Sequence, residues 1–329
     1  MSAVAEPSDV SEAYDRFDGL DFLRRYGIVV VFAAIILTMV ITSPQFRTQG
    51  NFLNLLRQNA IIGILACAMT FAIILGGLDL SVGANAALSS VVAARLMIDF
   101  NIPLGIAGAL LTGLLIGIGN GLLIAYVGVN PFVSTLGTMT VVRGLVYVWT
   151  NATPLFGVAF SFTRLGLGSS FRVPNPFWIF LIVAVILYIL LSRIRFGHYI
   201  YAIGGNALAA REMGINVKRT KLLVYAMIGV CAAISGIILV GQTATGQPAG
   251  ALNYELTAIA AVIVGGATLS GGYGNLLSTI VGVYLLGVVS NALNLFGVSP
   301  FWQPVATGSI LIVAVAVDSA AARSARLVR

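Results

Sequence analysis

The stretch Gly76-Gly77-Leu78-Asp79-Leu80-Ser81-Val82-Gly83 interrupts a long apolar region of the chain. Apolar residues dominate positions 60–75 before it and 84–94 after it. Backbone that leaves helical geometry inside a bilayer has to be buried in protein or line a wet cavity. A carboxylate at that depth costs several kcal/mol unless it has a partner or water. The stretch therefore predicts a broken helix that carries Asp79 into a solute passage. The alternative is a short surface loop in which Asp79 caps a helix that begins at Leu80 or Ser81.

The composition indicates an integral membrane protein. Of the 329 residues, 59% are hydrophobic and 9% are charged, whereas soluble domains have about 25% charged residues. The apolar runs are too long for barrel strands and do not alternate, which excludes an outer-membrane barrel. Spans of about 20 residues each would use nearly the whole chain. We therefore expect an all-α fold with no separate soluble catalytic domain.

The hydropathy pattern predicts about ten transmembrane helices with broken or re-entrant glycine-rich segments. They form one membrane domain over 26–318, between a flexible polar cytoplasmic tail at 1–25 and a basic cytoplasmic tail at 319–329. The glycines at 113, 117 and 121 allow helices to approach closely. The expected spans are 26–41, 51–75, 81–98, 103–126, 132–149, 175–191, 221–240, 254–264, 276–295 and 301–317.

The distribution of the net charge of +7 indicates membrane topology rather than nucleic-acid binding. Lys and Arg gather at the ends of spans, as the positive-inside rule expects. The loop 193–221 is the most basic, whereas the loop before the sixth span carries only Arg164 and Arg172. We expect 193–221 to be cytoplasmic and, with ten spans, both termini as well.

The pattern Gly-Gly-x-x-Leu-Ser-x-Gly occurs twice, from Gly76 and again from Gly265. The copies lie about 190 residues apart, and transporters often interrupt helices at matching points of two repeats. With ten spans, however, both copies point the same way, unlike the halves of an inverted repeat. Coincidence remains an alternative.

Polar side chains within apolar regions are candidates for the substrate pathway. Amides and hydroxyls can donate to or accept from the hydroxyls of a neutral solute. The alternative is hydrogen bonding between helices, at about 0.6–2 kcal/mol each. Glu255 is expected close to the outer boundary. The predicted pathway residues are Asp79, Ser81, Asn85, Gln242, Glu255, Asn291 and Asn294.

The sequence offers no obvious catalytic or metal site. A phosphate-binding G-x-x-x-x-G-K-[ST] motif is absent, so we expect no ATP site in this chain. His198 is the single histidine, and Cys67 and Cys231 lack metal-ligand spacing. An ion-coupled transporter acting alone is the main alternative, but such proteins usually carry intramembrane acids in pairs or relays. An intramembrane enzyme would need more acids or histidines than the chain provides.

The loop 204–216 reads as a turn, a short helix and a glycine stop. Such a helix, exposed at the cytoplasmic face, is a surface that a soluble partner can bind. The alternative is a solvated connector.

Four stretches together are similar to a known family. They are 51–58 (NFLNLLRQ), 76–83 (GGLDLSVG), 204–216 (GGNALAAREMGIN) and 294–303 (NLFGVSPFWQ). The chain resembles the ribose/xylose-type permeases of bacterial ATP-binding-cassette (ABC) sugar importers over about 26–318. It departs from them at Leu78, where the family usually has isoleucine. Permeases for branched-chain amino acids are related, but the glycine stretch resembles the sugar type.

The resemblance implies the ABC importer permease fold and a subunit that is not itself an enzyme. It also implies the bacterial inner membrane as the location. A periplasmic binding protein would deliver a monosaccharide, and the permease would pair with a second copy or a close paralogue. A cytoplasmic ATPase, holding the ATP and magnesium, would dock on the loop at Gly205, Asn206, Ala209, Ala210, Arg211, Glu212 and Gly214.

Overall fold

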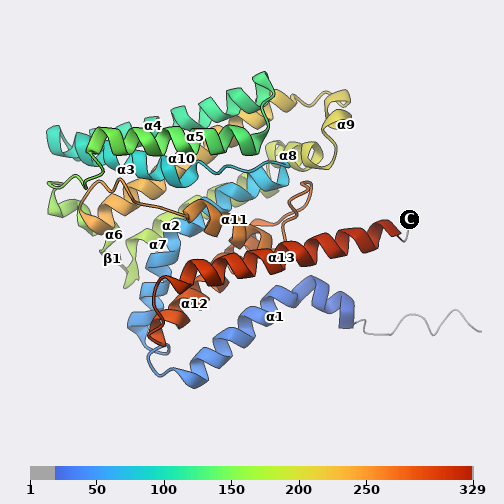
Figure 1. Cartoon of the computed structure of the whole chain (residues 1–329), viewed down its shortest axis with the longest axis horizontal. Helices are drawn as coiled ribbons and strands as arrows, with labels where there is room; N and C mark the ends of the chain where they lie inside the picture. Colours follow the sequence, from blue (N-terminus) through green and yellow to red (C-terminus); the bar gives the residue numbers. More distant parts are fainter. Residues whose placement is uncertain (1–18, 328–329) are drawn as a thin grey trace, which may run out of the picture.

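The structure is a computed structural model that describes residues 19–327, and α-helices dominate it (Figure 1). The only strands in the described residues form a two-residue hairpin, so the all-α prediction is confirmed. The helices are α1 (Gly19–Thr42), α2 (Gln49–Ile74), α3 (Val82–Asp99), α4 (Ile102–Leu122, continued by the π-helical turn Leu123–Val127), α5 (Pro131–Thr150), α6 (Thr163–Gly166), α7 (Asn175–Ser192), α8 (Arg195–Gly205), α9 (Ala207–Glu212), α10 (Val217–Thr243), α11 (Tyr254–Val264), α12 (Leu276–Leu295) and α13 (Trp302–Leu327). A 3-10 turn (Phe160–Phe162) and the strands β1 (Ser169–Ser170) and β2 (Val173–Pro174) complete the list.

Each of the ten predicted spans coincides with a helix. Within the described residues, seven helices are long and apolar enough to cross a membrane: α2, α3, α4 with its π-helical turn, α5, α7, α10 and α12. The apolar parts of α1 and α13, and the whole of α11, are shorter. The chain is thus a multi-pass membrane protein, and the number ten stays a prediction.

Both predicted tails overlap helices. Helix α1 begins at Gly19, inside the predicted tail 1–25, and α13 ends at Leu327, inside the predicted tail 319–329. Residues 1–18 lie outside the described part of the chain. The flexibility of the tails therefore stays a prediction.

Polar residues fix where several helices begin. The hydroxyl of Thr48 accepts a hydrogen bond from the backbone N of Asn51 at the start of α2. The side chains of Asn101 and Asn130 cap α4 and α5 in the same way, each just before a proline in the first turn. Such caps satisfy backbone N–H groups that the helix itself leaves free. The turns between the apolar segments are therefore encoded locally.

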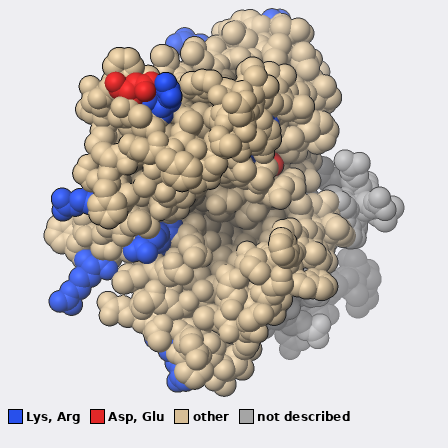
Figure 2. Space-filling model, turned by 60° about the vertical axis from the view of Figure 1, so that its left-hand side comes forward, with Lys and Arg blue, Asp and Glu red and all other residues tan. Residues whose placement is uncertain are grey.

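The core lies around α2, α3 and α10, while α4, α5 and α7 face outward. Figure 2 shows a surface that is mostly uncharged, with its charged side chains in a few small groups. Exposed apolar side chains on the outer helices include Leu111, Leu115, Val141, Leu145 and Ile182. An apolar exterior of this kind suits lipid or another protein subunit.

Helix α4 crosses α10 with their backbones in contact. A Cβ atom at Gly113 would overlap the carbonyl oxygen of Gly229, and one at Gly117 would overlap that of Tyr225. The third glycine, Gly121, faces Leu222. The predicted close approach of helices at these glycines is confirmed, and its partner is α10.

The chain is built from two halves of opposite direction. Helix α2 packs against α11 and α12, and α10 packs against α3 and α4 in the equivalent way. Likewise α11 packs against α12 and α13 as α3 packs against α4 and α5. Just beyond the end of α2, the Leu78 carbonyl accepts a hydrogen bond from Tyr225, in the first third of α10, so the two helices are antiparallel. The fold is an inverted repeat of α2–α5 and α10–α13, an arrangement common in transporters.

The sequence echo at Gly76 and Gly265 does not mark these repeats. Both copies end a helix, but the residue with left-handed backbone is Gly76 (φ 81°) in the first copy and Gly266 (φ 89°) in the second. The structural match is thus shifted by one residue from the sequence match. In the inverted repeat, the counterpart of Gly76 is Ala244 (φ 55°), which ends α10. The echo reflects two similar helix C-terminal turns.

Candidate transport pathway

Two interruptions of the helical structure carry or adjoin five of the seven predicted pathway residues: Asp79 and Ser81 lie in the first, Asn85 follows it, and Gln242 and Glu255 flank the second. We call residues 75–81, between α2 and α3, the first break, and residues 244–253, between α10 and α11, the second break. They occupy equivalent places in the two halves. The helices that follow them meet, because the carboxylate of Glu255 in α11 lies against Gly83 in α3.

In the first break, a chain of hydrogen bonds holds Asp79. Asp79 and Ser81 are each 1% exposed. Oδ1 of Asp79 accepts from the backbone N (2.8 Å) and the Oγ (2.6 Å) of Ser81. Nδ2 of Asn120 donates to Ser81 Oγ (2.9 Å), and Thr138 Oγ1 donates to Asn120 Oδ1 (2.6 Å). The side chain of Asp79 therefore links the break to α4 and α5, and α3 begins only at Val82.

The backbone of the first break is also tied to α10. The hydroxyl of Tyr225 donates to the carbonyl oxygen of Leu78 (3.2 Å). A Cβ atom at Gly77 would lie 2.6 Å from that hydroxyl, closer than real Cβ contacts. Only glycine fits at position 77 without displacing Tyr225.

Asn85 has its partners inside the bundle. It is 1% exposed, and its Nδ2 donates to the carbonyl oxygens of Gly113 (3.4 Å) and Gly229 (3.5 Å). Ser89 Oγ donates to Asn85 Oδ1 (3.1 Å). Asn85 therefore bonds to both helices where α4 crosses α10.

The second break folds back along α3 and does not stay at the surface. Gly246 exchanges two backbone hydrogen bonds with Leu155, both 2.9 Å, and the backbone N of Gln247 donates to Ser90 Oγ (3.3 Å). Arg143 of α5 holds the segment from the other side, with Nη1 donating to the carbonyl oxygens of Pro248 (3.1 Å) and Gly250 (2.9 Å). The connection between α10 and α11 is thus packed into the bundle against α3 and α5.

The place of Glu255 close to the outer boundary stays a prediction. The second break brings this residue to Gly83, at the start of α3, where it is 8% exposed. Its Oε2 has no hydrogen-bond partner among the described residues. Gln242 lies elsewhere, half-buried in the last turn of α10 beside Gly166 of α6. The structure therefore separates Gln242 from Glu255.

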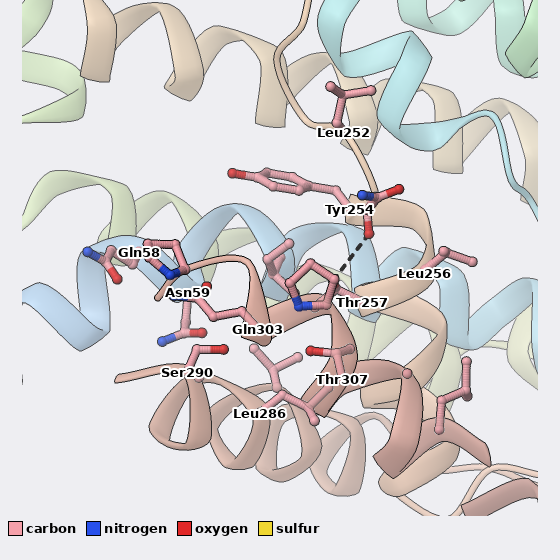
Figure 3. A pocket seen from close by; sticks show the side chains of 18 residues that line it. Gln58, Asn59, Leu252, Tyr254, Leu256, Thr257, Leu286, Ser290, Gln303 and Thr307 are labelled. Carbon is pink, nitrogen blue, oxygen red and sulfur yellow. Dashed lines mark hydrogen bonds between the residues drawn. The ribbon is translucent and has the colours of Figure 1, made fainter. Parts of the chain in front are cut away.

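A cavity of about 550 Å³ lies between α2, α12, α13 and the start of α11 (Figure 3). None of the side chains that line it is charged. Figure 3 shows Gln58 and Asn59 of α2 near Ser290 of α12 and Gln303 of α13, with Tyr254 across the cavity. Its polar lining consists of Gln58, Asn59, Asn253, Tyr254, Thr257, Ser290, Gln303 and Thr307.

Asn291 and Asn294 do not line this cavity. Asn291 exchanges two amide hydrogen bonds with Asn51 (3.1 and 2.8 Å), which join α12 to α2. Asn294 is exposed and accepts from Nε2 of Gln303 (2.9 Å). Both asparagines lie near the end of α12 that borders the cavity, and their role in the pathway stays a prediction.

The predicted coupling residues lie together on the short helix α9. Oδ1 of Asn206 accepts from the backbone N of Leu208 (3.0 Å) and Ala209 (3.1 Å), and Gly214 (φ 83°) ends the turn after the helix. The predicted turn, short helix and glycine stop are therefore confirmed. Ala210 is buried, whereas Gly205, Asn206, Ala209, Arg211, Glu212 and Gly214 are exposed.

These features define a class of protein: a membrane transport subunit, or permease. Two polar breaks meet inside an apolar helical bundle, and an uncharged polar cavity lies beside them. Within the described residues, no group of three or more His, Cys, Asp or Glu side chains could hold a metal ion.

The chain belongs to the family described as the permease component of branched-chain amino acid transport systems, which it matches over residues 51–315. It is 41% identical to the ribose import permease protein RbsC of Bacillus subtilis over 305 residues, covering 92% of this chain and 94% of the relative. It is 36% identical to the D-allose transport system permease protein AlsC of Escherichia coli, covering 94% and 96%. For the L-arabinose permease AraH of E. coli the identity is 37%, covering 89% and 90%. No solved structure matches the chain.

These similarities confirm the resemblance to sugar permeases and the expectation of a transport subunit that is not an enzyme. The sequence missed the cavity residues Gln58, Ser290, Gln303 and Thr307. The available signal was polar residues in two of the stretches that carry the resemblance, Gln58 in 51–58 and Gln303 in 294–303.

Proposed function

We propose that this chain is the permease subunit of an ABC importer that carries a monosaccharide across the bacterial inner membrane, with both termini in the cytoplasm. The observation that carries the proposal is the uncharged polar cavity in a chain related to permeases named for ribose, D-allose and L-arabinose. Amide and hydroxyl groups can both donate to and accept from sugar hydroxyls, and a charged lining would favour a charged solute.

The solute enters from the periplasmic side, where a sugar-binding protein delivers it. The cavity lies at the start of α2, the start of α11, the end of α12 and the start of α13. With the loop 193–221 in the cytoplasm, these ends all face the periplasm. A second permease copy or a close paralogue completes the central path.

Beyond the cavity, the two breaks form the gate. Asp79, Ser81 and Asn85 at the first break and Glu255 after the second belong to the pathway when the breaks separate, and Gln242, at the end of α10, belongs to the part of the pathway before the second break. The buried Glu255 carboxylate supports this role, because its Oε2 lacks a hydrogen-bond partner in this state and a buried acid is expensive unless another state satisfies it. Asn291 and Asn294 hold α12 against α2 and against α13 beside the cavity.

A separate ATPase supplies the energy by binding α9. Leu208 is 75% exposed and Met213 84% exposed, next to the charged pair Arg211 and Glu212. Such an apolar tip with charged neighbours suits a protein partner better than water. ATP and magnesium belong to that partner.

The experiment is uptake of labelled ribose, D-allose and L-arabinose into proteoliposomes that contain this permease, its ATPase and its binding protein. We expect uptake that requires ATP and is unaffected by dissipating proton and sodium gradients. Gradient-driven uptake without the ATPase would instead establish an ion-coupled transporter.

A matched pair of variants tests the cavity. Thr307→Val removes a hydroxyl from its lining, while Thr112→Val removes one that only donates to the Gly108 carbonyl oxygen within α4. One hydrogen bond of about 1 kcal/mol corresponds to about a fivefold change in affinity. We expect a rise of about fivefold in half-saturating sugar for Thr307→Val and none for Thr112→Val. Equal effects would remove the cavity from the pathway.

A further inference from the structure

The end of α8 packs against two glycine segments that lie far apart in the sequence. A Cβ atom at Gly204 would overlap the carbonyl oxygen of Ile74, the last residue of α2, and would lie 2.7 Å from the backbone N of Gly272. That backbone N donates to the same Ile74 carbonyl (2.8 Å). Gly271 in turn approaches Gly76 and the Gly204 carbonyl, where its Cβ would lie 3.0 and 3.1 Å away. Three backbones thus touch with no side chains between them.

A tyrosine on α8 adds a side-chain link. The hydroxyl of Tyr201 donates to the carbonyl oxygen of Gly274 (2.7 Å), just before α12 begins. Tyr201 is half-buried, and burial raises the pKa of its hydroxyl, with a smaller contribution from Tyr273. The hydroxyl therefore stays protonated and remains a donor.

Helix α8 is joined to α9 through the single extended residue Asn206 and is anchored in the core. Asn206 ends α8 and caps α9, so the two helices share one residue. On α8, Ile200 is 0% exposed and Ile203 is 3% exposed. A displacement of α9 therefore moves α8, and with it the backbones that α8 contacts.

We propose that Gly204 and Tyr201 are positioning residues that transmit the movement of α9 to both halves of the permease at once. This inference rests on the proposed function, in which an ATPase binds α9. Through Gly204 the movement reaches the end of α2 and the first break. Through Tyr201 and the Gly272 contact it reaches the connection between α11 and α12. Neither residue is among the predicted coupling residues, all of which lie from Gly205 onward.

Two glycines in helices provide a matched test. A Cβ atom at Gly204 overlaps Ile74, whereas one at Gly119 of α4, outside the coupling loop, meets nothing within 4 Å. We would measure sugar transported per ATP hydrolysed by the reconstituted complex of permease, ATPase and binding protein. For Gly204→Ala we expect this ratio to fall at least tenfold while ATP hydrolysis continues, and for Gly119→Ala we expect it to stay within twofold of the unaltered complex. A purely structural role would lower the amount of folded complex and leave the ratio unchanged.

Tyr201→Phe keeps the proposal falsifiable if Gly204→Ala does not fold. It removes only the hydroxyl that reaches Gly274, and we expect the ratio to fall about threefold to fivefold, as for loss of one hydrogen bond. An unchanged ratio in Tyr201→Phe, or equal losses in Gly204→Ala and Gly119→Ala, would overturn the inference while ATP-driven uptake by the unaltered complex upholds the proposed function. Absence of ATP-driven uptake in the unaltered complex would overturn both.

Discussion

Replacing Asp79 separates the structural and the transport roles of the first break. In Asp79→Ala, the backbone N and the Oγ of Ser81 lose their acceptor in a buried place. A buried donor without a partner costs about 1–3 kcal/mol, so we expect a loss of about 2–6 kcal/mol. In Asp79→Asn the Oδ1 acceptor remains and only the charge is lost, at about 1–2 kcal/mol. Asp99→Asn, which weakens an exposed pair with Arg95, is the control and should change stability by less than about 1 kcal/mol.

Thermal unfolding of the purified protein in detergent measures these differences. At about 2 °C per kcal/mol for a chain of this length, Asp79→Ala should lower the midpoint by about 4–12 °C and Asp79→Asn by less than half of that. Uptake by Asp79→Asn then reports on the pathway: a folded variant with reduced uptake supports a role for the carboxylate there. If Asp79→Ala unfolds no earlier than Asp79→Asn, the hydrogen-bond argument for the break is wrong.

Three further variants test other contacts. Gly113→Ala should lower stability by about 1–3 kcal/mol because its Cβ overlaps α10. Gly119→Ala in the same helix meets nothing within 4 Å and should be neutral or stabilising. Similar unfolding midpoints for the two variants would contradict the close crossing of α4 and α10. Arg143→Met removes two charged hydrogen bonds to the second break and should cost about 3 kcal/mol of stability. It should also increase proteolysis within the second break. An unchanged digestion pattern would argue that Arg143 does not hold this segment. The double variant Arg211→Glu, Glu212→Lys should keep the unfolding midpoint but separate ATP hydrolysis from uptake, and normal coupling in it would exclude docking on α9.

The helices were predictable because hydropathy and capping are local. Even the short α11 was placed at 254–264 from its apolar run and the glycines after it, and the structure has it at Tyr254–Val264. The helix starts at Asn101 and Asn130 likewise follow from an asparagine close to a proline. None of these features depends on contacts with distant parts of the chain.

Local hydropathy and capping could not predict the path of the second break. Residues 244–253 are polar and rich in glycine, which is typical of a surface turn. Their packing into the bundle depends on partners distant in sequence, Leu155 through its backbone and Ser90 and Arg143 through their side chains. The contact of Glu255 with Gly83 follows from that path, so the sequence could not indicate it.

The sequence pattern did not reveal the inverted repeat, for a related reason. Sequence comparison found Gly76 and Gly265, which share a helix-ending turn, whereas the true counterpart of Gly76 is Ala244. A left-handed residue that is glycine in one half and alanine in the other leaves no shared pattern to find. Packing preserves the relation between the halves where the sequence does not.

The absence of charged side chains from the cavity lining bears on the energy source of the transporter. No charged side chain lines the cavity, so the interaction of a neutral solute with the lining has no charge–charge component for salt to screen. For the same reason, the membrane potential exerts no force on a charge in the cavity. Loading from the periplasmic side should therefore be almost independent of ionic strength and of membrane potential. Under the proposed function, the direction of transport is then imposed from the opposite end of the molecule, where we propose that the ATPase binds α9.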